Sequence, residues 1–183
     1  MSYGMPLAPP PTDLAPERPS AVPASGDALR TALRDLPSPV VVVTAETPHG
    51  PHGATIGSFT SVSLDPPLVS INVTHGSRLH AALSDADAWA VHLLAADQAA
   101  VAERFARPDL DGDAQLAPFG HVRGEGPPLL RGSLGILLCG AHARFEAGDH
   151  TVFVGEVTHT IEGSGRDPLL YYRQSYRGVG DQV

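Results

Sequence analysis

The stretch that decides the fold is GATIGSFTSVSLDPPLVSIN, residues 53–72. Gly53 and Gly57 free its backbone from Cβ crowding, and its serines and threonines carry hydrogen-bonding groups on short side chains. Apolar residues are interleaved with these hydroxyls, so one side of the segment can join a core while the other presents polar groups. Such a surface suits a flat polar ligand. An ordinary Ser/Thr-rich strand and turn is the alternative, and composition alone does not choose between the two.

Chain length and charge limit the possible classes of protein. The 183 residues correspond to one domain with room for a substantial core. Twelve arginines, with no lysine, stand against 20 acidic residues, which gives a formal net charge of −8. Because no basic run could follow a phosphate backbone, nucleic acid is not expected as a partner.

Cysteine usage and hydropathy indicate the compartment. The single cysteine, Cys139, lies in an apolar run, so neither an intramolecular disulfide nor a thiolate metal cluster is possible. The N-terminus lacks a basic region followed by an apolar one, and no apolar stretch has the length of a membrane span. We therefore expect a soluble, cytoplasmic protein with no membrane partner.

Proline content divides the chain near its start. Residues 1–26 hold seven prolines and little to bury, which is typical of a disordered or polyproline-like arm. From Asp27 the apolar residues have helical spacing up to Leu36, and Pro37 ends the pattern. We expect residues 27–183 to form the folded domain.

Strand and helix patterns then alternate along this domain. Residues 39–45 are a β-branched run with both faces apolar, followed by a turn over residues 46–53. The next strands are expected within residues 53–72, at 68–74 and at 88–94. Helices are expected at residues 77–83, with Ser77 near the N-cap, and at residues 98–105. Residues 106–128 are predicted to be a long excursion with at most one short strand.

The C-terminal third gives the clearest topology. Residues 133–145 and 150–161 are two long β-prone runs separated by Glu-Ala-Gly-Asp, which predicts a hairpin. The other connections are too short and too varied for repeated βαβ units. The sequence thus favours a mainly β protein, an antiparallel barrel with short peripheral helices.

Nine histidines raise the question of a metal site. If the hairpin turn is centred on residues 147–148, His150 lies opposite Phe145 and His142 opposite Phe153, on different faces of the sheet. No HExxH spacing occurs, so no metal site is expected. Motifs for a nucleophile elbow or a phosphate loop are also absent. One candidate remains at the barrel rim, His150 beside Asp149, with a purely structural histidine as the alternative.

Several segments, in order and spacing, resemble the flavin reductases of two-component monooxygenase systems, which are FMN-binding split-barrel proteins. The resemblance covers residues 37–177, and its most specific parts are SFTSVSLDPPLV and GDHTVFVGEV. The other matching segments are residues 39–45, SRLHAAL (77–83), AWAVHLLAADQAAVAERFA (88–106), APFG (117–120), PPLLRGSLGILLCGAHARFEA (127–147) and DPLLYYRQSYR (167–177).

This resemblance implies an antiparallel Greek-key split β-barrel that forms a homodimer, with the flavin, FMN or FAD, in a groove contributed partly by the partner subunit. NADH or NADPH would be the co-substrate. Hydride would pass from the nicotinamide to the flavin, and a separate flavin-dependent monooxygenase would receive the reduced flavin.

The resemblance also implies roles for individual residues. His150 would act as the catalytic residue that orients the nicotinamide or stabilises charge on the reduced ring. Tyr172 and Tyr176 would cover the stacked rings on the same side. Ser77 and Arg78 would contact the phosphate, and Phe105 would lie near the ring system or in the core. The remaining flavin contacts would come from Thr55, Ser58, Phe59, Thr60, Ser61, Val62, Ser63 and Asn72.

Two other functions stay open at this point. An oxidoreductase of the same fold could retain FMN and reduce another acceptor. A flavin-binding protein without turnover belongs to a different class. Consumption of NADH in the presence of added flavin separates the three.

Overall fold

The computed structural model describes residue 21, residues 23–164 and residues 167–180, and it divides the chain into two compact units, one ending at Leu33 and the other beginning at Arg34. The predicted Pro-rich arm lies almost entirely outside the described residues. In the first unit, helix α1 (Gly26–Leu33) has no buried residue. It ends before the predicted Leu36, because a residue that precedes a proline disfavours the helical conformation.

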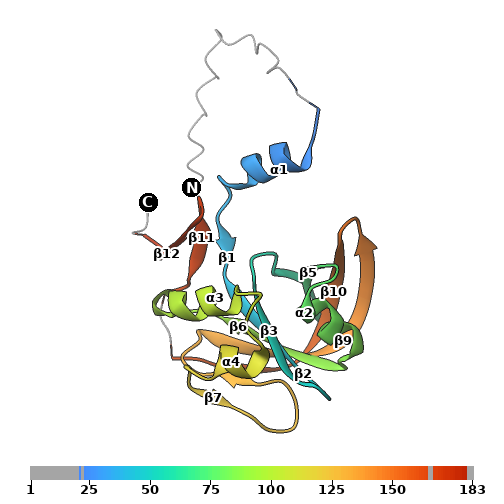
Figure 1. The fold of residues 1–183 in the computed structure, drawn as a ribbon, viewed down its shortest axis with the longest axis vertical. Helices are drawn as coiled ribbons and strands as arrows, with labels where there is room; N and C mark the ends of the chain where they lie inside the picture. Colours follow the sequence, from blue (N-terminus) through green and yellow to red (C-terminus); the bar gives the residue numbers. More distant parts are fainter. Residues whose placement is uncertain (1–20, 22, 165–166, 181–183) are drawn as a thin grey trace, which may run out of the picture. The chain divides into compact units, whose positions relative to one another are not determined.

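The second unit is built on one antiparallel sheet of seven strands, in the order β3-β2-β6-β9-β10-β5-β4 (Figure 1). In chain order these strands are β2 (Val41–Thr47), β3 (Gly50–Ile56), β4 (Thr60–Leu64), β5 (Pro67–Thr74), β6 (Ala88–Leu93), β9 (Gly135–Ala147) and β10 (His150–Glu162). The strands predicted at 39–45, 68–74 and 88–94 are thereby confirmed within one or two residues.

Strand β2 is buried on both faces, as its β-branched sequence predicts. Val41 and Val43 point into one apolar core, which we call core 1, while Val42 points into a second, core 2. Alternate side chains of a strand face opposite ways, so a continuous apolar run allows one strand to serve two cores.

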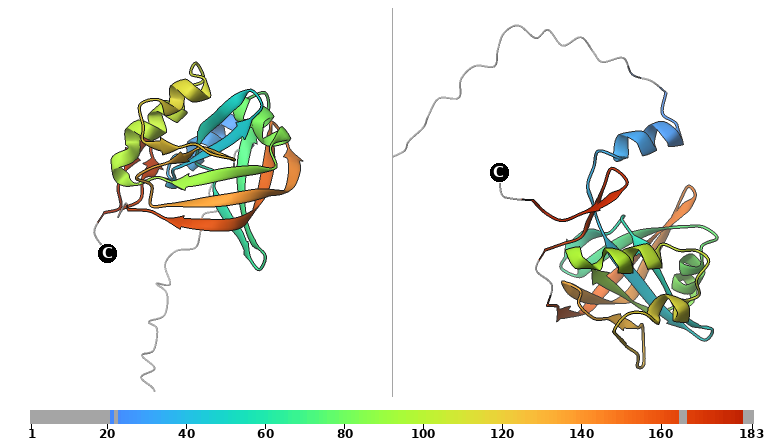
Figure 2. Two further views of the ribbon diagram at one scale, coloured as in Figure 1. Left: turned by 90° about the horizontal axis from the view of Figure 1, so that it is seen from below. Right: turned by 60° about the vertical axis from the view of Figure 1, so that its left-hand side comes forward.

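Core 1 lies inside the bend of the sheet, which Figure 2 shows curving round on itself. Residues of β2, β5, β6, β9 and β10 meet there, and helix α2 (Arg78–Asp85) adds Leu79, Ala82 and Leu83. Within the described residues the edge strands β3 and β4 do not pair with each other, so the barrel is split rather than closed. The predicted fold class, an antiparallel split barrel with short peripheral helices, is confirmed.

Core 2 lies on the other side of β2, under helix α3 (Ala99–Phe105), which follows a short 3-10 helix η1 (Ala96–Gln98). The excursion predicted for residues 106–128 contributes to this core. It contains helix α4 (Gly112–Leu116), which the sequence analysis missed, and strand β7 (His121–Val122), which pairs with β8 (Leu129–Leu130). Asp111 caps α4 by accepting from the Ala114 amide at 2.7 Å.

A small second sheet joins the two ends of this unit, β1 (Ser38–Pro39), β11 (Leu170–Tyr172) and β12 (Ser175–Arg177). The turn between β11 and β12 consists of Arg173 and Gln174, at φ +47° and +61°. Left-handed backbone at two residues suits the twist of a two-residue hairpin, although glycine or asparagine usually occupies such positions.

Two predicted turns need correction. The turn after β2 is shorter than residues 46–53, because β3 already begins at Gly50, whose φ of +103° suits glycine. In the β9–β10 hairpin the turn is formed by Gly148 and Asp149, so His150 pairs with Ala147 and not with Phe145. Gly148, at φ +66°, takes the first turn position, and this moves the register by two residues.

The predicted pairing of His142 with Phe153 is also wrong, since Phe153 pairs with Arg144 and a register shift follows at Val154. His142 lies in that irregularity, 3.7 Å from the Glu156 carboxylate. A bulge places two residues of one strand opposite one residue of its partner, so pairs counted outward from the turn are no longer correct beyond it.

None of the helices in the described part of the chain is both long and apolar enough to span a membrane.

Candidate functional site

A cavity of about 490 Å³ opens where β3, α2 and the end of α3 meet, and we call it the Arg78 cavity. Its size falls in the range of small-molecule sites. Small residues form much of its wall. The lining comprises Gly53, Ala54, Thr55, Gly76, Ser77, Arg78, Leu79, Phe105, Ala106, Arg107, Pro108 and Gln115.

Glycine is required at one side of this cavity by close packing. A Cβ at Gly53 would lie 2.5 Å from Cε1 of Phe105, far inside van der Waals contact. Phe105 itself is 2% exposed and belongs to core 2, yet its ring reaches the cavity wall. Phe105 therefore lies in the core, as one of the two expectations had it, and it also contributes to the cavity wall.

Ser77 and Arg78 lie at the start of α2, as predicted. The Ser77 hydroxyl accepts from the His80 amide at 3.1 Å and caps the helix. The Arg78 guanidinium donates to the carbonyls of Pro108, at 2.7 Å, and Leu110. Arg78 thus places a cation at the cavity wall and also holds the loop that follows α3.

That loop contributes a second guanidinium that the sequence analysis missed. Arg107 lines the cavity and pairs with Asp109 through two contacts of 3.1 and 2.6 Å. The hydrogen bonds from Arg107 hold the pKa of Asp109 below its usual value. The signal available in the sequence is a cationic residue two positions after the helix predicted at residues 98–105, in a segment without a regular apolar pattern.

Two predicted flavin contacts in β3 and the following loop already have structural partners. The Thr55 hydroxyl donates to the Ala102 carbonyl at 2.7 Å and joins β3 to α3. The Ser58 hydroxyl accepts from the Asn72 amide at 3.0 Å and faces the Asn72 carbonyl at 3.2 Å. Any contact of Thr55 or Ser58 with a ligand would therefore fall mainly to the backbone.

The rest of the predicted set is spread along β4 and its neighbours. Thr60, Ser61 and Val62 are exposed, whereas Phe59 packs partly against core 1. The Ser63 hydroxyl accepts from the Asp65 amide at 3.2 Å in the β4–β5 turn. Asn72 is exposed on β5. The Arg78 cavity therefore gathers Thr55, Ser77, Arg78 and Phe105, and the β4 residues do not line it.

His150 lies at the start of β10 with both ring nitrogens engaged. Nδ1 is 2.7 Å from Oδ1 of Asp149, and Nε2 is 3.0 Å from the Thr74 hydroxyl. The hydrogen bond with His150 is the main reason why the pKa of Asp149 is lowered. Since the side chain is 39% exposed, the ring is oriented by its neighbours and still reachable from solvent.

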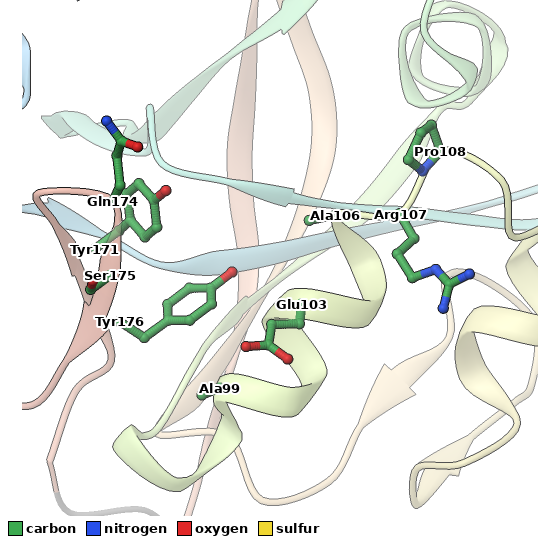
Figure 3. A pocket seen from close by; sticks show the side chains of 9 residues that line it. All are labelled: Ala99, Glu103, Ala106, Arg107, Pro108, Tyr171, Gln174, Ser175 and Tyr176. Carbon is green, nitrogen blue, oxygen red and sulfur yellow. The ribbon is translucent and has the colours of Figure 1, made fainter. Parts of the chain in front are cut away.

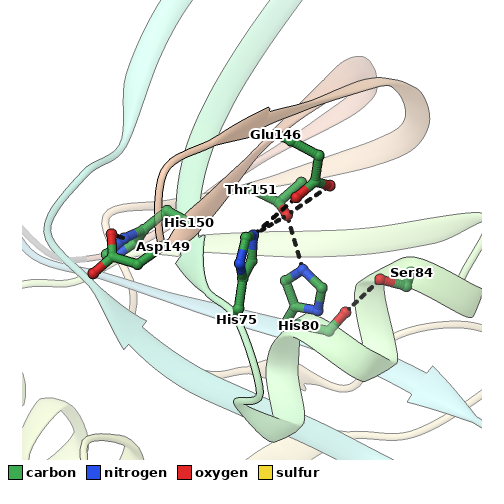
Figure 4. A network of polar contacts seen from close by, with 7 residues as sticks. All are labelled: His75, His80, Ser84, Glu146, Asp149, His150 and Thr151. Atoms are coloured by element: carbon green, nitrogen blue, oxygen red, sulfur yellow. Dashed lines mark hydrogen bonds and ion pairs between the residues drawn. The ribbon is translucent and has the colours of Figure 1, made fainter.

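A polar network on the other face of the hairpin holds this corner in place (Figure 4). Thr151, which is buried, lies 3.1 Å from His75 and 2.8 Å from His80, and its hydroxyl donates to Glu146 at 3.1 Å. His75 also lies 2.9 Å from Glu146. No sequence pattern indicates this cluster, because its members come from the turn after β5, from α2 and from both strands of the β9–β10 hairpin.

The two predicted tyrosines differ in their surroundings. Tyr176 lines a second cavity of about 710 Å³. Tyr172 does not line it, and the Arg173 guanidinium lies 5.3 Å from the centre of the Tyr172 ring. The second cavity shares Ala106, Arg107 and Pro108 with the Arg78 cavity. It is lined by Ala99, Glu103, Ala106, Arg107, Pro108, Tyr171, Gln174, Ser175 and Tyr176 (Figure 3).

The described residues contain no group of three or more His, Cys, Asp or Glu side chains that could hold a metal ion. Burial raises the pKa of the Cys139 thiol to about 12, so a reactive thiolate is not available at neutral pH.

These features fit a flavin phosphate. Backbone without a side chain at Gly76 leaves room at the wall, and a guanidinium and a helix N-terminus suit a dianion. Chemistry at the adjoining rim would then depend on His150, which has the donor and acceptor groups to orient a second ligand.

Comparisons with known proteins identify the same chemistry. The family model described as "Flavin reductase like domain" matches residues 33–180. An NADH-dependent FMN reductase from Agrobacterium fabrum is 42% identical over 147 residues, which cover 78% of this chain and 79% of that protein.

Two solved structures are similar in fold as well as sequence. The NADH:FAD oxidoreductase of Streptomyces globisporus, solved with NAD and FAD fragments, has a TM-score of 0.77 and 38% identity, covering 83% of this chain and 91% of that one. BorF, the flavin reductase component of a bacterial two-component tryptophan halogenase, has a TM-score of 0.78 and 35% identity, covering 86% and 100%. The resemblance inferred from the sequence motifs is confirmed, and this chain belongs to the flavin reductase family.

Proposed function

We propose that this protein is an NADH-dependent flavin reductase that passes reduced flavin to a separate flavin-dependent oxygenase or halogenase. The observation that carries the proposal is the Arg78 cavity, where the open backbone of Gly76, a helix N-terminus and a guanidinium meet next to the rim that bears His150. Relatives that reduce FMN or FAD with NADH, and one that serves a halogenase, support it.

The chain's own residues divide the work. Ser77 and Arg78 bind the flavin phosphate, and backbone groups of β3 and β4 hold the flavin ring. When bound, the flavin supplies an acceptor for the hydride of NADH. His150, oriented by Asp149 and Thr74, positions the nicotinamide for that transfer.

Exposed apolar side chains support the homodimer. Leu64 is 88% exposed on β4, an edge strand, and Val62 and Phe145 are more than half exposed. A second copy would cover them and complete the flavin groove along β4. Light scattering should therefore give the mass of a dimer, and Leu64→Asp should shift it toward the monomer. A wild-type monomer that is fully active would contradict this part of the proposal.

Steady-state NADH consumption with added FMN or FAD tests the function. We expect turnover that saturates with free flavin, since a diffusing substrate must enter and leave. A protein that retains flavin and ignores added flavin would instead be an oxidoreductase for another acceptor. Absence of NADH consumption with either flavin would leave only a flavin-binding role and overturn the proposal.

A further inference from the structure

The second cavity, which we call the Glu103 cavity, is not accounted for by the flavin phosphate site. It lies between α3 and the β11–β12 hairpin, and its 710 Å³ would hold a nucleoside-sized group (Figure 3). Glu103 points from the helix toward Tyr176, while the Arg107 guanidinium points away from both.

The charge of this cavity is set by a single carboxylate. Glu103 takes part in none of the ion pairs found among residues 21, 23–164 and 167–180, whereas Arg107, the only cation in the lining, is held by Asp109 at 2.6 Å. The pKa of Tyr176 is raised by burial and then by the charge of Glu103, which agrees with a carboxylate close to the phenol. A ligand group here would meet a hydrogen-bond acceptor and negative charge.

Aromatic rings form the opposite wall. Tyr171 and Tyr176 meet edge to face with ring centres 5.4 Å apart, and both line the cavity. Tyrosine rings offer flat surfaces on which a purine base can stack.

The turn that carries this wall is under backbone strain. Arg173 and Gln174 both adopt positive φ without being glycine, and Arg173 is held by a 2.7 Å contact with Asp35. Such strain persists where surrounding contacts enforce it, and it is concentrated at ligand sites.

The position of the cavity indicates how a ligand would reach it. Ala106, Arg107 and Pro108 separate it from the Arg78 cavity and line both. A dinucleotide with one end at the flavin site can therefore extend its other end past these residues.

We propose that the Glu103 cavity binds the adenosine moiety of a dinucleotide, with Glu103 accepting hydrogen bonds from the ribose 2′- and 3′-hydroxyls and repelling a 2′-phosphate. The base lies against the tyrosines. This proposal rests on the proposed function and adds to it a residue that selects NADH over NADPH. A carboxylate that recognises a ribose diol is a known means of that selection in unrelated folds. The same adenosine occurs in NADH and in FAD, so either can supply it.

Direct binding tests the cavity without turnover. By calorimetry, AMP should bind the wild-type protein more tightly than 2′,5′-ADP, whose extra phosphate meets Glu103. Glu103→Gln should remove this preference, because the amide keeps the size of the side chain without its charge. The matched control is Glu162→Gln, an exposed change of the same kind at the end of β10, which should leave the preference intact.

Kinetics then identify the source of the adenosine. If it comes from NADH, Glu103→Gln lowers the NADH to NADPH ratio of kcat/KM about tenfold, the effect of losing one charged hydrogen bond. If it comes from FAD, the variant raises KM for FAD and not for FMN, while the NADH to NADPH ratio stays constant.

The two proposals fail differently. A wild-type protein that binds AMP in preference to 2′,5′-ADP but does not oxidise NADH would contradict only the proposed function. The adenosine assignment would be overturned if the wild-type protein oxidises NADH and a folded Glu103→Gln variant has the same nucleotide preferences and the same kinetics with FAD and FMN as the wild type.

Discussion

Two histidines on different strands of one sheet have opposite surroundings. His92 on β6 has no exposed surface. Its Nδ1 lies 2.9 Å from the Val42 carbonyl, and its Nε2 has no hydrogen-bond partner in the described part of the chain. His150 on β10 is 39% exposed, and both of its nitrogens have partners.

The difference separates stability from chemistry. Burial lowers the pKa of His92 to about 4, so its ring stays neutral and serves packing in the sheet. His150 has an oriented ring that a ligand can reach, which is what a positioning role in hydride transfer needs. A histidine is thus a functional candidate when its neighbours orient it at an accessible rim, and burial with an unpaired nitrogen does not by itself indicate function.

The largest effect on turnover is expected at His150, on the rim of the barrel. His150→Ala should lower kcat by about 10²–10³-fold, the usual loss when one preorganised polar group is removed from a reaction centre. Flavin affinity and the melting temperature should change little, because the side chain is partly exposed and lies outside the Arg78 cavity. Steady-state kinetics and flavin titration of the same preparation measure both quantities.

The core histidine should act on the pH dependence of stability. The pKa of His92 is about 4 in the folded protein against 6.5 when unfolded, so between these values only the unfolded state takes up the proton. Its contribution to stability is complete above pH 6.5 and falls by about 3 kcal/mol as the pH drops to about 4.

Denaturant unfolding of wild type and His92→Gln across this range checks the expectation. The glutamine variant should show a flatter curve and keep its kcat at neutral pH. Parallel curves for the two proteins would mean that His92 is not the group that titrates.

Arg78→Ala should weaken FMN binding about tenfold and leave riboflavin binding nearly unchanged, because only FMN carries the phosphate. The guanidinium also holds the loop at Pro108, and loss of that contact alone would weaken both ligands equally. Fluorescence titration with the two flavins therefore separates phosphate binding from loop support.

The smallest effect is expected at Asp149. Asp149→Asn keeps an acceptor for His150 but removes the charge, so kcat should fall by only about threefold, as for an exposed ion pair. Because His150 lowers the pKa of Asp149, the stabilisation from this pair is present above the ordinary carboxyl value of 3.8 and is lost as the pH falls further. Melting temperatures of both proteins should converge in that acidic range.

The sequence was informative where local pattern decides structure. The β-branched run of β2, the cap at Ser77 and the β9–β10 hairpin follow from apolar spacing, a hydroxyl before a helix and a Gly-containing turn. Each of these depends on residues that are close in the chain.

Contacts between distant segments were not predictable in the same way. The hydroxyls of Thr55 and Ser58 looked free for a ligand, yet they bond to Ala102 and Asn72. Arg107 and Glu103 gain their positions only when α3 packs beside the cavities, which no single-sequence pattern encodes.

The contrast between the two histidines is tested most directly by measuring His150→Ala and His92→Gln side by side. For each variant, one experiment measures the anaerobic rate of flavin reduction at saturating flavin and NADH, and a second measures unfolding at several pH values. We predict that His150→Ala loses the rate and keeps the wild-type unfolding curve, while His92→Gln keeps the rate and flattens the pH dependence. A His150→Ala protein that binds flavin weakly but reduces it at the wild-type rate when saturated would contradict the assignment.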